Sequence, residues 1–129
     1  MNILKKALFT CTLLTLLPDI ANAQYKSYEV SRYSYAQFST SGESSIDLFN
    51  RYGDQIGILI FLPVDPNLLP NASLDPNDGL VRLYYTASQL DSVIDLLRNE
   101  SPIVLNYWVG FGNNSHIGTR QHEPIGENE

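Results

Sequence analysis

The residues that could carry out catalysis or bind a metal are few and poorly spaced. His116 and His122 are the only histidines, and Cys11 is the single cysteine. The two imidazoles lie six residues apart near the end of a predicted strand, which does not favour a zinc site. No serine stands in the G-x-S-x-G turn that exposes a nucleophile. We therefore predict no catalytic residue, no metal site and no cofactor.

Aromatic side chains are better candidates for binding. The candidates are Tyr85, Tyr107, Trp108 and Phe111, on two predicted strands and a turn that flank a predicted helix. If exposed together, such rings form a platform for sugars or a hot spot for a protein partner. Tyr107 and Trp108 are neighbours on one strand, so only one of them can point into the same core. Whichever of Tyr107 and Trp108 is exposed is the first predicted contact residue. The alternative to a binding surface is that most of these rings are buried in the core.

The first 23 residues have the organisation of a secretory signal peptide. Lys5 and Lys6 precede an apolar run of 11 residues, and Ala21-Asn22-Ala23 provides the small residues that a signal peptidase reads. That run is too short to span a bilayer as a helix. We expect cleavage near Ala23 and a periplasmic or secreted product, with no membrane association after cleavage. The mature product would be one domain, residues 24–129, with a frayed acidic tail from about residue 121 and no disulfide.

The charge of the mature chain narrows the classes of partner. Without Lys5, Lys6 and Asp19 the chain has 6 basic and 13 acidic residues, a net charge of −7. This balance disfavours nucleic acid and anionic membrane surfaces. It favours a basic protein partner, with solubility alone as the plainer explanation of the acidity. The carboxylates expected to supply the charge are Asp75 and Asp78 in a loop and Asp91 and Asp95 on a helix.

The first half of the mature chain predicts strands. Tyrosines alternate with polar residues over 25–38, but the alternation changes parity near Ser31, which predicts a bulge or bend. Residues 46–52 favour a short strand over a single helical turn. The most apolar segment, 56–62, predicts a central strand covered on both faces. Residues 63–79 are rich in proline and predict an ordered loop held to the body by Leu68 and Leu69.

The second half predicts one helix between strands. After a predicted strand at 80–85, Thr86 and Gln89 have the spacing of a capping box. Apolar residues follow at 90, 93, 94 and 97, which predicts an amphipathic helix over about residues 87–99. Residues 103–109 and 115–120 predict two further strands. The pattern indicates an α+β fold: a small antiparallel sheet or OB-like barrel with one amphipathic helix.

At the level of this pattern the chain resembles small exported OB-fold domains, including bacterial toxin B subunits. The resemblance runs from Val81 to Arg120 through a strand, a helix capped at Thr86, the strand Pro102 to Tyr107 and a short final strand. It contains no specific sequence motif. The resemblance implies a small curled barrel, and it implies no particular activity.

Three functions are compatible with these features. The leading hypothesis is an exported, non-catalytic binding protein of the bacterial envelope whose acidic surface contacts a protein. An immunity or inhibitor role toward a basic toxin or hydrolase is one form of it. The alternative is a glycan-binding module that stacks sugars on Trp108 or Tyr107. Such a module could be an oligomer. A hydrolase that uses Asp47, Asp54 or Glu43 is the third, although no pair of these carboxylates has a spacing of known catalytic geometry.

Overall fold

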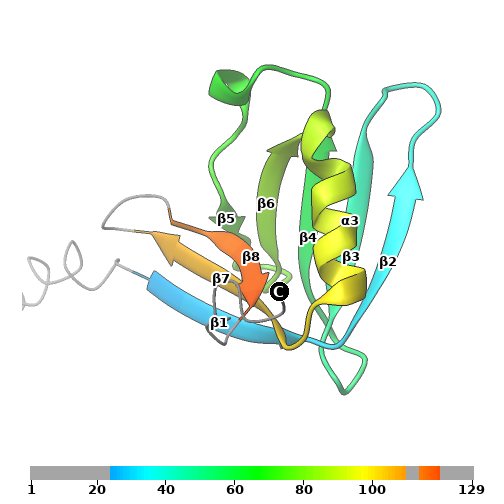
Figure 1. The fold of residues 1–129 in the computed structure, drawn as a ribbon. Coiled ribbons are helices and arrows are strands. Elements are labelled where there is room, and N and C mark those ends of the chain that lie inside the picture. The colour runs from blue at the N-terminus through cyan, green and yellow to red at the C-terminus, as the bar shows by residue number, and fades with distance from the viewer. Residues whose placement is uncertain (1–23, 110–113, 120–129) are drawn as a thin grey trace, which may run out of the picture.

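Two β-sheets and one α-helix make up the part of the chain that the computed structural model describes, residues 24–109 and 114–119 (Figure 1). The three-stranded sheet has the order β1-β7-β8 and the five-stranded sheet the order β2-β3-β4-β6-β5. The predicted α+β class is therefore confirmed. The strands of the smaller sheet are β1 (Gln24–Val30), β7 (Ile103–Val109) and β8 (His116–Thr119). Those of the larger sheet are β2 (Arg32–Gln37), β3 (Ser44–Phe49), β4 (Gln55–Leu62), β5 (Ser73–Leu74) and β6 (Val81–Thr86).

A change of course near Ser31 is present as predicted, but it is more than a bulge or bend, because it divides the predicted strand between two sheets. β1 ends at Val30 and pairs with β7, whereas β2 begins at Arg32 and pairs with β3. The Ser31 amide donates a hydrogen bond to the carbonyl oxygen of Phe49 at 2.9 Å. The chain therefore passes from one sheet to the other without a loop.

The pairing of β4 with β6 corrects the prediction of a purely antiparallel sheet. These two strands are parallel, with Leu59 opposite Leu83, while the other strand pairs are antiparallel. A parallel pair needs a crossover connection, and the segment between β4 and β6 provides it. Within residues 24–109 and 114–119 the two sheets do not close into a barrel.

The crossover contains more structure than the predicted loop. It forms a short 3₁₀ helix, η1 (Pro66–Leu68), and the edge strand β5. The predicted anchor Leu68 is 66% exposed, so that expectation is wrong, while Leu69 is half-buried. Ala72 and Leu74 pack against the core in its place. The anchor lies later in the loop because β5 pairs with β6 there.

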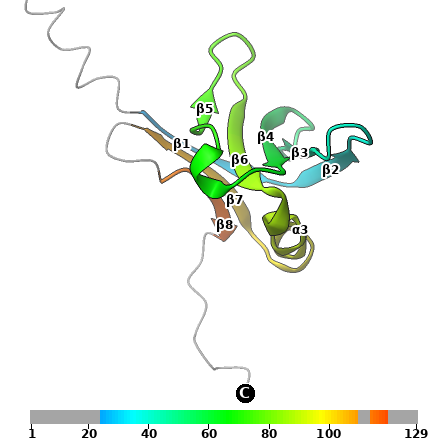
Figure 2. The ribbon, with the colours of Figure 1, turned by 90° about the horizontal axis from the view of Figure 1, so that it is seen from above.

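The predicted helix is confirmed together with its start signal. A 3₁₀ turn, η2 (Ala87–Gln89), leads into α3 (Leu90–Asn99), and the side-chain oxygen of Gln89 accepts a hydrogen bond from the Thr86 amide at 3.2 Å. Val93 is buried against the five-stranded sheet, and Figure 2 shows α3 on one side of that sheet. None of the helices in the described ranges is long and apolar enough to cross a membrane.

Both sheets share one core. The largest fully buried side chains are Phe61, Ile46, Leu48, Leu59, Leu105 and Val81. The sheets approach each other closely at Gly57, where a Cβ atom would lie 2.6 Å from the Leu105 Cδ2. The β4 side chains on the opposite face, Ile58, Ile60 and Leu62, are half-buried. The prediction that both faces of this strand are covered is therefore only partly correct.

Candidate functional site

Trp108 lies on the outer face of the three-stranded sheet. Along β7 the side chains alternate, so Leu105 and Tyr107 enter the core while Trp108 points away from it. Trp108 is 40% exposed and Tyr107 only 6% exposed. The expectation that these neighbours face opposite ways is confirmed, and the prediction of Tyr107 as a contact residue is wrong because its side chain is buried.

A second exposed aromatic residue, Tyr25, packs against Trp108. The two residues are directly opposite in the pairing of β1 with β7. Their ring centroids are 5.0 Å apart at an interplanar angle of 72°, an edge-to-face arrangement favoured by the ring quadrupoles. Tyr25 is 56% exposed, so the pair presents apolar surface to solvent while each ring limits the freedom of the other.

A row of polar side chains continues from this pair across the sheet. The Tyr25 hydroxyl donates to the Asn106 Oδ1 at 3.3 Å, and the Asn106 Nδ2 lies 3.1 Å from the His116 Nε2. The His116 Nδ1 is 2.6 Å from the carbonyl oxygen of Asn114. A consistent assignment has the Asn106 amide donating to the His116 Nε2, and the His116 Nδ1 donating to Asn114. The row therefore holds the carboxamide and the imidazole in fixed orientations.

The backbone at Trp108 is also held in place. Its amide donates to the Ser115 Oγ at 2.9 Å, and the same hydroxyl lies 3.3 Å from the Trp108 carbonyl oxygen. These contacts join β7 to the residue that precedes β8. We call Tyr25, Asn106, Trp108 and His116 the aromatic face. Tyr25 and Trp108 lie near the start of β1, the end of that strand away from β2 (Figure 1), while Asn106 and His116 lie beside its middle.

The other predicted aromatic contacts do not belong to this face. Tyr85 is half-buried and stacks on Phe61, with ring centroids 5.5 Å apart at 20°. Burial raises the pKa of its hydroxyl, and a hydrogen bond with the Ile117 backbone opposes that rise. Tyr85 thus joins β6 to β8 inside the fold, which corrects its prediction as a contact residue. Phe111 lies outside the described residues.

Two of the four predicted acidic contacts are paired with a cation. The Arg82 guanidinium lies 2.8 Å from the Asp78 Oδ2 and 3.7 Å from the Asp75 Oδ2. Its hydrogen bond to Asp78 holds the pKa of that carboxyl below its ordinary value. The Asp75 and Asp78 carboxylates also accept backbone hydrogen bonds from Asn77 and Leu80 within the loop. These two carboxylates therefore stabilise the β5–β6 connection, and their charge is partly neutralised.

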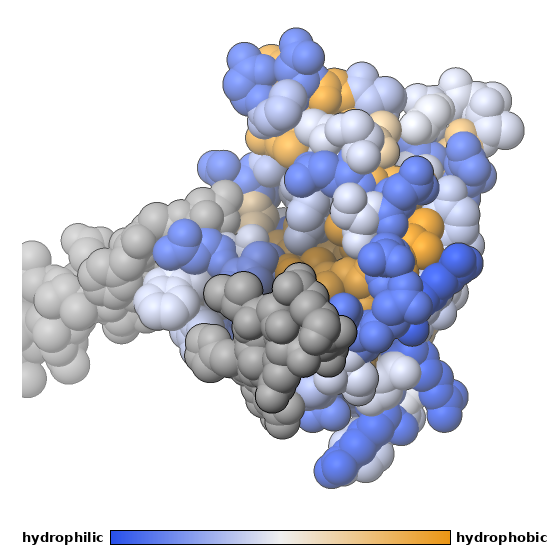
Figure 3. Space-filling model, in the orientation of Figure 1, coloured by the Kyte–Doolittle hydropathy of each residue, from blue (hydrophilic) through white to orange (hydrophobic). Residues whose placement is uncertain are grey.

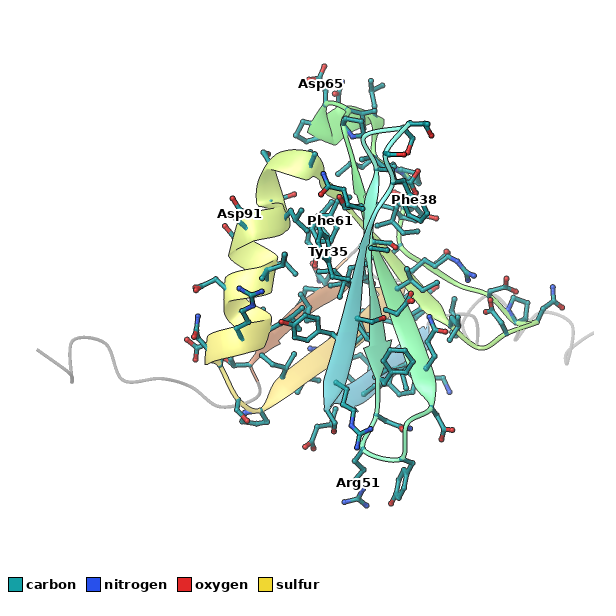
Figure 4. All side chains as sticks on the ribbon, turned by 90° about the vertical axis from the view of Figure 1, so that its right-hand side faces the viewer. Tyr35, Phe38, Arg51, Phe61, Asp65 and Asp91 are labelled. Carbon is teal, nitrogen blue, oxygen red and sulfur yellow. The ribbon has the colours of Figure 1, made fainter. Side chains whose placement is uncertain are left out.

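The two acidic residues of α3 are more available. Asp91 and Asp95 are exposed, and Figure 4 shows Asp91 pointing away from the sheet. The Asp95 Oδ1 accepts a hydrogen bond from the Asn99 Nδ2 at 2.6 Å. Figure 3 shows that this side of the molecule is largely hydrophilic, with apolar atoms exposed beside the helix.

The carboxylates considered for hydrolysis do not meet in a shared site. Asp47 lies on β3, where its Oδ1 accepts a hydrogen bond from the Gln55 Nε2 at 3.1 Å. Glu43 precedes β3, and Asp54 follows the turn at its other end. Across residues 24–109 and 114–119, no three His, Cys, Asp or Glu side chains are grouped as metal ligands would be.

Sequence reasoning missed three members of the aromatic face. The pattern predicts a strand at Tyr25 and Asn106, and it predicts no site at His116, so it identifies none of the three as a contact residue. The one local signal was that Asn106 and Trp108, two residues apart on a strand, share a face. It could not identify Tyr25 or His116 as neighbours, because the register of β1 and β8 on β7 is a long-range property.

Comparison with known proteins assigns neither a family nor a function to this chain. The chain matches no protein-family model, and it has no significant match among curated proteins or solved structures.

Proposed function

We propose that the protein is an exported, non-catalytic binding protein that recognises another protein through the aromatic face. The observation that carries the proposal is the exposed Tyr25–Trp108 pair. Tryptophan and tyrosine are enriched among the residues that dominate protein interfaces. They bury a large area when a partner docks and lose little side-chain entropy, particularly where they already support each other.

The hydrogen-bonded row adds directional contacts to this apolar surface. Asn106 and His116 are oriented before a partner arrives, so binding does not have to order them. The charge of −7 expected for the mature chain favours a basic partner and fast association at low ionic strength. Asp91 and Asp95 are exposed sources of that charge, whereas Asp75 and Asp78 are paired with Arg82. An immunity or inhibitor role toward a basic protein is one form of this proposal.

Export and architecture remain part of the proposal. The signal-peptide pattern of residues 1–23 supports export to the periplasm or out of the cell. Sequencing the N-terminus of the native protein tests this step, with Gln24 expected as the first residue. The resemblance to exported OB-fold domains concerns only the pattern of strands and helix, so it does not indicate which partner the protein binds.

The main test is capture of a partner from envelope extract at low salt. Tagged wild-type protein should retain a basic protein that high salt releases. Trp108→Ala should weaken retention by about 30-fold, the loss typical of an interface hot spot. Tyr52→Ala is the matched control, because Tyr52 is 73% exposed at the tip of the β3–β4 hairpin, outside the aromatic face. If both variants retain the partner equally, the aromatic face is not the contact surface.

Glycan binding is a second candidate, favoured by the polar side chains beside Trp108. A sugar ring can stack on an indole while amide and imidazole groups hydrogen-bond its hydroxyls. Trp108 is the single tryptophan of the chain, so its fluorescence reports directly on this face. Saturable quenching by an oligosaccharide, abolished by Asn106→Ala, would favour the glycan over the protein partner.

A further inference from the structure

A different surface, the outer edge of β2, has the features of a pairing site. Among the described residues, β2 is the last strand of the five-stranded sheet and is bonded on one side only, to β3. Its sequence, Arg32–Gln37, contains no proline, and its single charged residue, Arg32, stands at the start of the strand. Proline and charged side chains within an edge strand are among the features that prevent pairing with another chain. Figure 4 looks at this edge, with β2 in front.

The hydrogen-bond pattern identifies which backbone groups point outward. Phe38 donates to the carbonyl oxygen of Glu43 at 2.9 Å, which makes these residues a hydrogen-bonded pair. Such pairs alternate along an antiparallel ladder. The amides and carbonyls of residues 32, 34 and 36 therefore point toward β3, and those of Tyr33, Tyr35 and Gln37 point away from the sheet. These outward groups can bond an added strand.

The side chains along this edge leave apolar surface uncovered. Tyr33 and Tyr35 lie on the side of β2 that faces the core, opposite Leu48 and Ile46 in β3. Tyr33 is half-buried, and its hydroxyl accepts a hydrogen bond from the Arg98 Nε at 3.3 Å. Tyr35 is 44% exposed, although its cross-strand neighbour Ile46 is completely buried. Its hydroxyl donates a hydrogen bond to the Gln37 Oε1 at 3.3 Å, and the exposed part of the ring is open to a neighbour from another molecule.

A cavity lies beside Tyr33, where such a neighbour could be received. It has a volume of about 400 Å³ and is lined by Val30, Ser31, Arg32, Tyr33, Leu97 and Ile103. It therefore lies between the start of β2, the end of α3 and the start of β7. Its lining combines aliphatic side chains with a phenol ring, which suits an aromatic side chain that enters from the edge.

We propose that a second copy of this chain pairs with the first through β2, antiparallel about a two-fold axis. Ser34 of each copy lies opposite Ser34 of the other, and Tyr35 of each lies opposite Tyr33 of the other. This register uses the outward backbone groups of Tyr33 and Tyr35 as hydrogen-bonded pairs. It also brings the exposed Tyr35 ring of each copy to the cavity beside Tyr33 of the other. Two five-stranded sheets then become one continuous sheet.

Several features favour a second copy as the occupant. A two-fold axis perpendicular to the sheet keeps the core-facing sides of both strands on the same side, so aromatic residues meet aromatic residues. Arg32 lies opposite Ala36, and no two like charges oppose each other within the paired strands. The acidity of each copy opposes association, but at physiological ionic strength charges more than about 8 Å apart are largely screened. The aromatic face lies elsewhere, so this pairing is independent of the proposed function.

Disulfide crosslinking tests the register directly. Only Cys11 is present in the sequence, and it precedes the described domain. In Ser34→Cys the two new thiols lie on a non-hydrogen-bonded pair, where Cα atoms are about 4.5 Å apart, within the range of a disulfide. In the control Ala36→Cys they are four residues out of register, about 13 Å along the strands, which is too far. Mild oxidation of the protein purified from its host should crosslink the first variant and leave the second monomeric on a non-reducing gel.

Sedimentation equilibrium tests the contact itself. The wild-type protein should associate to a dimer as its concentration rises. Tyr35→Lys should raise the dimer dissociation constant by more than about 100-fold, tenfold or more from each of the two symmetric contacts. Tyr52→Lys makes the same exchange at the exposed hairpin tip and should leave the constant unchanged. Circular dichroism establishes that both variants are folded.

Three results would overturn the proposal. These are a wild-type protein that stays monomeric at all concentrations, a dimer that Tyr35→Lys does not weaken, and crosslinking of Ala36→Cys as efficient as that of Ser34→Cys. A dimer weakened by Tyr35→Lys, together with selective crosslinking at position 34, supports it. Because Trp108→Ala leaves this edge unchanged, a failure of the aromatic face and a failure of the β2 dimer are distinguishable.

Discussion

The contact between the two sheets at Gly57 gives the sharpest prediction about stability. Gly57→Ala adds one methyl group at the point where β4 meets β7. That methyl would lie 2.6 Å from the Leu105 Cδ2 and 3.0 Å from the Val81 carbonyl oxygen. Carbon atoms prefer separations of about 3.5–4.0 Å, so both neighbours must move.

The expected cost follows from this geometry. Overpacking of a dense core costs about 1–3 kcal/mol, and relief of the backbone entropy of glycine returns about 0.5–1 kcal/mol. We expect Gly57→Ala to lower the free energy of unfolding by about 1–2 kcal/mol. Gly118→Ala is the matched control, because its methyl would meet only the His116 Cδ2 at 3.5 Å, an ordinary contact. This control should be neutral or slightly stabilising.

A double-mutant cycle separates the steric clash from other effects of the added methyl. Leu105 is completely buried, so Leu105→Ala alone should cost about 2–5 kcal/mol through the cavity that it leaves. In the double variant the new methyl enters part of that cavity. The combined loss should therefore be smaller than the sum of the two single losses by about 1 kcal/mol. The contact with the Val81 oxygen remains, so rescue should be incomplete.

The assay is equilibrium unfolding in urea, followed by circular dichroism and by the fluorescence of Trp108. All variants are compared at one protein concentration, because any dimer would make stability depend on concentration. Coincident transitions from the two probes justify a two-state free energy. Strict additivity of the two substitutions, or a Gly57→Ala protein as stable as the wild type, would refute the close approach of the sheets.

Two further predictions concern pH. Burial raises the pKa of Tyr85 in the folded state, so its contribution to stability is complete below the ordinary tyrosine pKa and is lost as pH rises through the folded value. Tyr85→Phe should flatten the alkaline fall of the unfolding free energy; an unchanged slope would contradict the burial argument. Arg82 lowers the pKa of Asp78, so this contribution is present above the ordinary carboxyl pKa and is lost as pH falls through the lowered value. Arg82→Met should move the carboxyl titration of Asp78, followed by NMR, back toward its ordinary value, and no movement would remove Arg82 as the cause.

Local signals in the sequence determined the individual elements well. The capping box at Thr86 and the apolar spacing of α3 predicted the helix because both depend on residues within two turns of each other. The parity change at Ser31 predicted a bulge or bend there for the same reason, although it did not predict that β1 and β2 belong to different sheets. The opposite orientations of Tyr107 and Trp108 follow from strand geometry alone.

The failures of prediction involve contacts that the local pattern does not show, whether the partners are distant in the sequence or joined by a turn. Nothing local distinguishes Tyr85, which stacks on Phe61 inside the fold, from an exposed strand tyrosine. The pairing of Asp75 and Asp78 with Arg82 depends on the turn that brings them together, so the four acidic residues looked equivalent in sequence. Leu68 looked like an anchor because it is apolar, but β5 fixes the loop through other residues.

The sequence by itself determined the acidic balance, the signal peptide pattern, the helix and the faces of the strands, since each depends on composition or on neighbours in the chain. Tertiary structure decided which strands pair and in what register. That register placed Tyr25 against Trp108, made β4 and β6 parallel and left β2 at an edge. Strand pairing depends on residues far apart in the chain and on the shared core that they bury, and a local pattern contains no record of either.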